Sequence, residues 1–210
     1  MRTAIAAALL LIATSAFAAS DFDAVIAKTI KTYGGEAAWK KVASIHEAGV
    51  VDSPMSGEGK TTRDWQQGKK LRVDIQYAKS HEVRDLDGDK GTHNGTPVTG
   101  MGYDAMVLQW ARLAIPAMLI EHRSELKDMG EKEGLRVIEI PISSSMSVMA
   151  AIDPKTGYIV RSGSEGMGMK FVTEYHDYKM SGGLLFAWRE ENFAQGMRTG
   201  ATTLSAIEVK

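Results

Sequence analysis

Hydrophobic residues follow a helical period near the N-terminus of this chain and a strand period along most of the remainder. Between residues 20 and 33 the apolar side chains fall on one helical stripe, which predicts an amphipathic helix. The polar Ser20 and Asp21 can cap its start, and two glycines after Tyr33 can end it. A second short helix is expected at EAAWKKV, residues 36–42.

Beyond these helices the apolar positions alternate with polar ones. In KLRVDIQYA, Leu71, Val73, Ile75 and Tyr77 share one face and polar residues occupy the other, which is typical of a half-buried strand. Turn residues at Asp87-Gly88, 153–157 and 181–183 favour hairpins between successive strands. Similar patterns predict further strands near 44–52, 60–67, 80–87, 134–142, 146–152, 157–163, 169–178, 184–193 and 197–209.

One segment interrupts the strand pattern. GYDAMVLQWARLAIPAMLIEH, residues 102–122, carries a helical apolar face that includes Met106 and Trp110, and Pro116 should kink or restart the helix. Helices inserted among about ten antiparallel strands predict an α+β fold. We expect a large antiparallel sheet, strongly curved by its own twist, with helices covering its concave face.

The first eighteen residues, MRTAIAAALLLIATSAFA, resemble an export signal. Arg2 precedes an apolar run, and Ala16-Phe17-Ala18 fits the small-x-small pattern before a cleavage site. We therefore expect a signal peptide at 1–18 and a single mature domain at 19–210. The chain has no cysteine, so neither a lipid anchor on an N-terminal cysteine nor a disulfide is expected. The sequence thus predicts an exported, soluble protein that does not span a membrane.

Charge excludes one class of partner. The formal net charge is −1 at pH 7, and no polybasic run is present. A nucleic-acid-binding protein would need a basic excess clustered on one face. No nucleic-acid partner is therefore expected.

The stretch PMSGEGKTT, residues 54–62, resembles the end of a phosphate-binding loop. However, Pro54 stands where the pattern requires its first glycine, and the residues that follow favour a strand instead of a helix. We predict instead that Pro54, Gly57 and Gly59 form a loop between two strands, and that Lys60 begins the second strand and faces solvent.

Other motifs of catalysis or metal binding fail at defined positions. DLDGDKG, residues 85–91, has Lys90 where a calcium loop needs glycine and would need a bidentate glutamate at Thr96. The five histidines show no metal-ligand spacing. Around Ser164, the sequence SGSEG has Ser162 where a nucleophile elbow needs glycine. We therefore expect no enzyme activity, no metal site and no cofactor.

What remains is apolar and aromatic content. The chain has twelve methionines, and methionine adapts to apolar ligands of varied shape. Such residues are equally suited to ordinary core packing. A sheet curved around a helix often leaves an apolar cleft, however, and clefts of that kind bind ligands.

The order of these segments resembles the LolA/LolB-like superfamily of periplasmic lipoprotein carriers, and in particular its outer-membrane lipoprotein-sorting branch. The fragments LDGDKG, DPKTG and DYKMSGGLLF carry most of the resemblance, which covers the whole mature chain. The resemblance implies an incomplete antiparallel β-barrel covered by helices, with a hydrophobic cavity that shields acyl chains in the periplasm. Thr92 departs from the pattern, since relatives often have tryptophan there. The lack of an N-terminal cysteine matches the soluble carrier type.

We therefore expect a soluble, monomeric periplasmic carrier for lipid or lipoprotein acyl chains, with lipoproteins or envelope proteins as possible partners. One alternative is a non-catalytic envelope interaction protein with a filled core. A further alternative is a hydrolase assembled from residues distant in sequence. The candidate cavity residues are Trp65, Val73, Ile75, Tyr77, Met106, Trp110, Met118, Met146, Met169, Phe171, Phe186 and Trp188.

Overall fold

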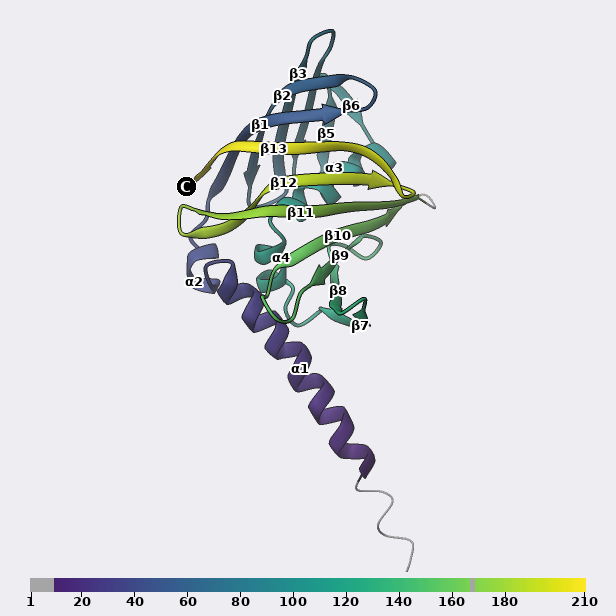
Figure 1. Ribbon diagram of the computed structural model, residues 1–210. Coiled ribbons are helices and arrows are strands. Elements are labelled where there is room, and N and C mark those ends of the chain that lie inside the picture. Colours follow the sequence, from purple (N-terminus) through teal and green to yellow (C-terminus); the bar gives the residue numbers. More distant parts are fainter. Residues whose placement is uncertain (1–9, 167–168) are drawn as a thin grey trace, which may run out of the picture.

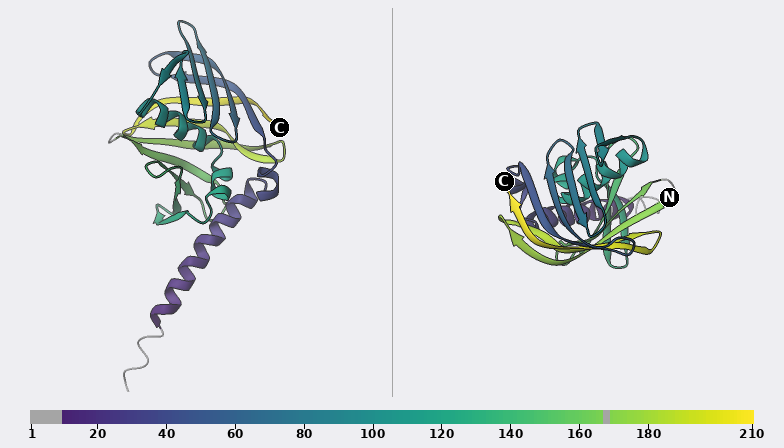
Figure 2. Two further views of the ribbon diagram at one scale, coloured as in Figure 1. Left: turned by 180° about the vertical axis from the view of Figure 1, so that it is seen from behind. Right: turned by 90° about the horizontal axis from the view of Figure 1, so that it is seen from above.

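One curved antiparallel sheet forms the body of the molecule, and helices lie on its concave side and below it (Figures 1 and 2). The computed structural model describes residues 10–166 and 169–210. Its helices are α1 (Leu10–Thr32), α2 (Glu36–Trp39), α3 (Met101–Leu113) and α4 (Ile115–Glu121). Its strands are β1 (Ser44–Ser53), β2 (Gly57–Gln66), β3 (Lys70–Tyr77), β4 (His81–Asp87), β5 (Lys90–His93), β6 (Thr96–Val98), β7 (Lys127–Lys132), β8 (Leu135–Pro141), β9 (Ser147–Ile152), β10 (Ile159–Gly166), β11 (Met169–Ser181), β12 (Leu184–Ala194) and β13 (Met197–Val209).

The strand order is β6-β5-β4-β3-β2-β1-β13-β12-β11-β10-β9-β8-β7. Two meanders, β1–β6 and β7–β13, thus meet where β1 pairs with β13. The sheet curves around α3 but does not close, because β6 and β7 form its two ends (Figure 2). The predicted α+β fold with a strongly curved, incomplete barrel is confirmed.

The seam between the meanders contains a β-bulge. The register between β1 and β13 shifts at Ala48 and Gly49. A Cβ atom on Gly49 would lie 2.2 Å from the Thr203 carbonyl oxygen and 2.8 Å from the Leu204 Cα atom. Only glycine lets the two backbones approach this closely.

Three strands were not predicted from the sequence. β5 and β6 are short and polar, and Pro97 sits on the end strand, where proline is tolerated. β7, KDMGEK, forms the other end of the sheet, and it lacks alternation because most of its side chains are exposed to solvent. The helices were all predicted, including the restart at Pro116, which lies in the first turn of α4. The predicted start of α1 was wrong: the helix begins at Leu10, so Ser20 and Asp21 lie within it, and α2 ends at Trp39 instead of residue 42.

The loop predicted at residues 54–59 is shorter than expected. β1 ends at Ser53 and β2 begins at Gly57, so Gly57 and Gly59 belong to the strand. A Cβ atom on Gly59 would lie 2.7 Å from the Tyr77 ring, which explains the glycine there. Lys60 is exposed in β2, as predicted, and no helix follows it.

The C-terminal half of α1 docks on the turn between β9 and β10. Lys28 Nζ donates to the Pro154 carbonyl oxygen at 3.0 Å, and Thr32 Oγ1 donates to that of Thr156 at 3.1 Å. Residues 10–18 of the predicted signal peptide continue the same helix away from the sheet (Figure 1). Residues 1–9 lie outside the described residues, and the signal peptide remains a prediction. Within the described residues, no helix is long and apolar enough to cross a membrane.

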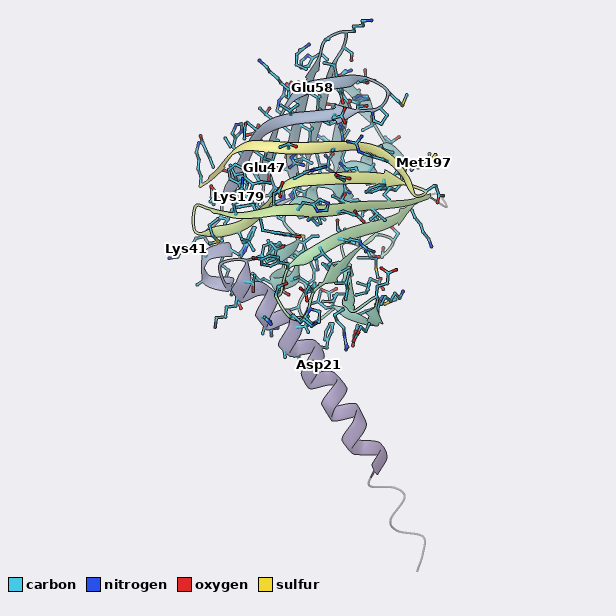
Figure 3. All side chains as sticks on the ribbon, in the orientation of Figure 1. Asp21, Lys41, Glu47, Glu58, Lys179 and Met197 are labelled. Carbon is cyan, nitrogen blue, oxygen red and sulfur yellow. The ribbon has the colours of Figure 1, made fainter. Side chains whose placement is uncertain are left out.

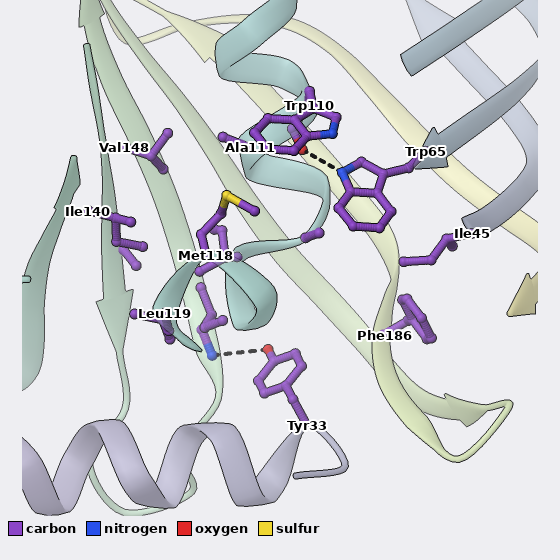
Figure 4. Close-up of a cluster of buried hydrophobic side chains, with 14 of the residues drawn as sticks. Tyr33, Ile45, Trp65, Trp110, Ala111, Met118, Leu119, Ile140, Val148 and Phe186 are labelled. Carbon is purple, nitrogen blue, oxygen red and sulfur yellow. Dashed lines mark hydrogen bonds between the residues drawn. The ribbon is translucent and has the colours of Figure 1, made fainter. Parts of the chain in front are cut away.

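A filled hydrophobic core lies between α1, α4 and the adjoining strands (Figure 4). Met118 and Leu119 of α4 pack here with Ile140 of β8, and all three are almost completely buried. The Ile159 backbone N–H donates to the Tyr33 hydroxyl at 3.1 Å and ties the end of α1 to β10. These contacts hold α1 and α4 against the strands at this end of the molecule.

Candidate ligand-binding site

A cavity of about 440 Å³ lies between α3 and the concave face of the sheet. Its walls come from α3, from β1–β4 and from β10–β13. Cavities of roughly 300–1,000 Å³ are typical of small-molecule sites. The cavity therefore has the volume of a ligand-binding site.

Helix α3 separates this cavity from the filled core. Its residues Met106, Val107 and Trp110 are buried in the core, while Leu108 and Arg112 line the cavity. The 3.6-residue period places these two sets on different faces of the helix. α3 thus acts as one wall of the cavity.

Two tryptophans fix α3 against the sheet. Trp65 Nε1 donates to the Trp110 carbonyl oxygen at 3.0 Å, and Trp110 Nε1 donates to that of Gln66 at 2.8 Å. Their rings stack with centroids 6.1 Å apart and an interplanar angle of 9° (Figure 4). Further toward the start of α3, the Tyr103 hydroxyl donates to the Gly88 carbonyl oxygen at 3.0 Å.

The walls of the cavity are mainly apolar, and its mouth carries both apolar and polar side chains. At the mouth, Met101 is 55% exposed and Phe171 is 37% exposed. The β12–β13 hairpin borders the same mouth through Thr199, and Met197 lies at the end of this hairpin (Figure 3). The side chains that form the apolar walls are Val51, Val73, Ile75, Tyr77, Leu108, Leu113, Val172 and Phe193.

The inner end of the cavity is polar and charged. Arg63 of β2 lies between two carboxylates, with Nε 2.7 Å from Glu47 Oε2 and Nη1 2.6 Å from Glu190 Oε2. Nη2 adds a second hydrogen bond to Glu190 Oε1 at 3.1 Å. All three side chains are buried. A bidentate arginine–carboxylate pair of this kind is geometrically specific.

Burial and charge act in opposite directions on this triad. Burial tends to lower the pKa of Arg63, but Glu190 and Glu47 outweigh it and raise that pKa above its ordinary value. Burial raises the pKa of Glu47, Glu190 raises it further, and Arg63 opposes both. Arg63 therefore stays charged, and its positive charge favours the ionised form of Glu47 against the effect of burial.

A second arginine at the inner end has a different environment. Arg112 Nη1 donates to Thr173 Oγ1, whose own hydroxyl donates to Asn192 Oδ1 at 2.8 Å. Arg112 Nε is buried and has no hydrogen-bond partner. Among the described residues, no carboxylate lies within 4.0 Å of a nitrogen of Arg112. Within the described part of the chain, this guanidinium therefore has no acidic neighbour in direct contact.

The structure places the predicted cavity residues in two groups. Val73, Ile75, Tyr77 and Phe171 line the cavity. The remaining residues lie elsewhere: Trp65, Met106, Trp110, Met118 and Phe186 are buried in the filled core, and Met146 packs partly buried against it.

Two predicted residues need separate mention. Trp188 does not line the cavity, and Lys179 Nζ lies 5.1 Å from the centroid of its ring. The side chain of Met169 lies outside the described residues. Trp65, Trp110 and Met118 also border a more open hollow of about 400 Å³ next to Trp39.

The charged residues of the cavity were missed because charge usually indicates solvent. Arg63 shares its strand face with Thr61 and Trp65, both buried. Strict alternation along β2 would have assigned Arg63 to the inner face. Glu190 and Arg112 offered no comparable signal, since their partners come from distant segments.

Ser164 lines the cavity from the middle of β10 and not from a strand-to-helix turn, so no nucleophile elbow is present at this serine.

Comparison with known proteins identifies the fold. The sequence matches no family model and no curated protein. A putative outer-membrane lipoprotein-sorting protein domain from Vibrio parahaemolyticus matches with a TM-score of 0.54 at 10% identity, over 88% of this chain and 91% of its own. A LolA superfamily protein from Nitrosomonas europaea matches with a TM-score of 0.58 at 9% identity, over 90% and 93%. The chain therefore has the fold of the LolA superfamily and lipoprotein-sorting structures.

Proposed function

We propose that the protein is a non-catalytic carrier that binds lipid or lipoprotein acyl chains in the cavity beside α3. Its setting would be the periplasm, in lipid or lipoprotein trafficking to the outer membrane, and the carrier would act as a monomer. The observation that carries the proposal is the cavity of about 440 Å³ with mainly apolar walls. The fold shared with lipoprotein-sorting structures supports it.

Physical chemistry explains why such a cavity would be needed. Each methylene removed from water gains about 0.8 kcal/mol, so an acyl chain crosses an aqueous compartment only when it is sheltered. The fixed position of α3 keeps a cavity open that hydrophobic collapse would otherwise fill. This open volume favours the carrier over an interaction protein with a filled core.

The proposal predicts that a side chain filling the cavity blocks ligand uptake. Ala105 lines the cavity from an exposed position on α3, so Ala105→Trp should insert an indole without disturbing the core. We expect the affinity for a fluorescent fatty acid to fall at least tenfold, while the free energy of unfolding changes by no more than about 0.5 kcal/mol. Fluorescence titration and urea denaturation measure the two quantities.

Ala27→Trp is the matched control, because Ala27 is exposed on α1 and does not line the cavity. It should leave uptake unchanged. Native mass spectrometry of the protein purified from a periplasmic extract should show a bound lipid mass. A bare protein mass, together with no uptake of fluorescent fatty acid by the unmutated chain, would refute the carrier function.

A further inference from the structure

We propose that the cavity takes a single-chain amphiphile head first, with a terminal carboxylate bound by Arg112 and the tail directed to the mouth. This inference rests on the proposed carrier function and specifies its ligand. It differs from a cavity that receives the acyl chains of a lipoprotein, because those chains enter tail first with their head attached to a polypeptide.

The first support is a gradient of polarity along the cavity. At the inner end, Arg63, Thr173 and Glu190 are only 5%, 2% and 8% exposed. At the mouth, the apolar Met101 and Phe171 are exposed beside the uncharged Thr199. A ligand that entered tail first would bury its apolar end against these polar groups. A head-first ligand matches polar with polar and apolar with apolar.

The second support is that Arg112 has no acidic partner in direct contact, whereas the other arginines of the cavity have theirs. Arg63 contacts two carboxylates, those of Glu47 and Glu190. Arg84 Nε lies 2.9 Å from Glu82 Oε1, and its Nη1 donates to Gln109. Arg112 bonds only the neutral Thr173, and its buried Nε has no partner. A carboxylate from a ligand would complete its hydrogen bonding.

Asp104, the acid of α3 that also lines the cavity, lies too far along the helix to contact Arg112. Asp104 precedes Arg112 by eight residues, which corresponds to about 12 Å along a helix axis at 1.5 Å per residue. Asp104 therefore lies toward the mouth. The inner end thus keeps a guanidinium that bonds Thr173 but leaves its Nε without a partner.

The local charge also selects the class of head group. The Glu190 carboxylate lines the same inner end and repels any anion there, so it opposes a dianion or a phosphate more strongly than a head group of single charge. The recess beyond, between Arg112, Tyr175 and Glu190, measures only about 40 Å³. A compact monoanion fits these limits, and a free fatty acid supplies one together with an apolar tail.

The head group is tested by comparing ligands that differ only at the head. Delipidated protein is titrated with myristic acid, myristyl alcohol and methyl myristate. Charge-assisted hydrogen bonds to arginine should make the acid bind roughly tenfold or more tightly than the alcohol. Arg112→Gln should abolish this preference and leave the affinity for the alcohol within about twofold.

Arg161→Gln is the matched control, because it removes the same charge from a residue that pairs with Glu133 and Glu174 outside the cavity. It should keep the preference for the acid. Arg112→Lys keeps the positive charge and should retain part of that preference. Circular dichroism verifies that each variant is folded.

The orientation is tested by moving a bulky group from one end of the ligand to the other. Dansylaminoundecanoic acid carries its bulk at the tail end and should bind, with loss of its fluorescence signal in Arg112→Gln. Lysophosphatidylcholine carries its bulk at the head and should bind at least tenfold more weakly than the free acid.

The possible outcomes separate the two proposals. Equal affinity for acid and alcohol, unaffected by Arg112→Gln, would overturn the head-first inference and leave the carrier function standing. Stronger binding of lysophosphatidylcholine than of the acids would do the same. Binding of none of these compounds would overturn both proposals together.

Discussion

At the scale of single residues, the floor of the cavity depends on Arg63. Arg63 of β2 contacts Glu47 of β1 and Glu190 of β12, so this cation links the three strands. A buried ion pair adds little net stability when it is compared with apolar residues of the same size, yet removing one partner is costly. Arg63 therefore contributes by keeping two carboxylates from being buried alone.

Replacing Arg63 should thus be far more damaging than replacing an exposed arginine. We expect Arg63→Met to lower the free energy of unfolding by about 3–5 kcal/mol, because Glu47 and Glu190 are left buried without a counter-charge. Arg72→Met is the control, since Arg72 is half exposed in its pairs with Asp85 and Asp74, and it should cost at most about 1 kcal/mol. Equal losses for the two variants in urea denaturation would mean that the triad does not form in solution.

Buried tyrosines should make the protein unstable to alkali. Burial raises the pKa of Tyr33 and Tyr178, and it raises the pKa of Tyr175 from its ordinary value of 10.0 to about 12. Between pH 10 and 12 the folded protein therefore holds a proton on Tyr175 that the unfolded chain has lost. Stability from this group is complete below pH 10 and is lost as the pH rises through this window.

The measurement is the absorbance of tyrosinate during an alkaline titration, followed together with circular dichroism. The tyrosines whose pKa is raised by burial should ionise only as the secondary structure is lost. Tyr175→Phe should reduce the loss of stability between pH 10 and 12. A single tyrosinate transition near pH 10 in a protein that stays folded would contradict this expectation.

At the scale of elements, the seam between β1 and β13 holds the two meanders together. Its bulge at Gly49 brings the backbones closer than any side chain allows. On β1, the bulge lies only two residues before Val51, which lines the cavity. A change at this bulge should therefore affect both the stability and the shape of the cavity.

Gly49→Ala tests the seam. The new Cβ atom would collide with the backbone of β13 at Thr203 and Leu204, so the strands must separate, and we expect a loss of about 1–3 kcal/mol in stability. Val50→Ala, one residue away and with its side chain 37% exposed, should change stability by no more than about 0.5 kcal/mol. Hydrogen exchange of the β1 and β13 amides would show whether the loss is local to the seam.

Sequence patterns predicted elements well where one face of an element is buried. β3 alternates strictly, so its inner residues Leu71, Val73, Ile75 and Tyr77 were assigned correctly. The amphipathic part of α1 from residue 20 was predicted for the same reason, and the restart at Pro116 was predicted because proline cannot continue a helix. β7 was missed because its face contacts solvent, and no apolar period marks a strand of that kind.

At the scale of the whole molecule, periodicity gives the face of a residue but not its position relative to α3. Leu71 and Tyr77 share the inner face of β3 and are both buried, yet only Tyr77 also lines the cavity. The same applies to Trp65, whose face was correct but whose end of β2 is covered by Trp110. The boundary between core and cavity depends on where α3 lies across the sheet, and that placement arises from contacts between segments far apart in the sequence.

The pairing of β1 with β13 also fixes when the sheet can form. Most neighbouring strands are joined by short turns, but these two come from opposite ends of the domain. Contacts of such long sequence separation form late, because the entropy of closing the intervening loop must be lost first. A growing or emerging chain can therefore assemble each meander early, but it cannot complete the sheet or enclose the cavity until β13 arrives. The cavity would become able to hold a ligand only at the final step of folding.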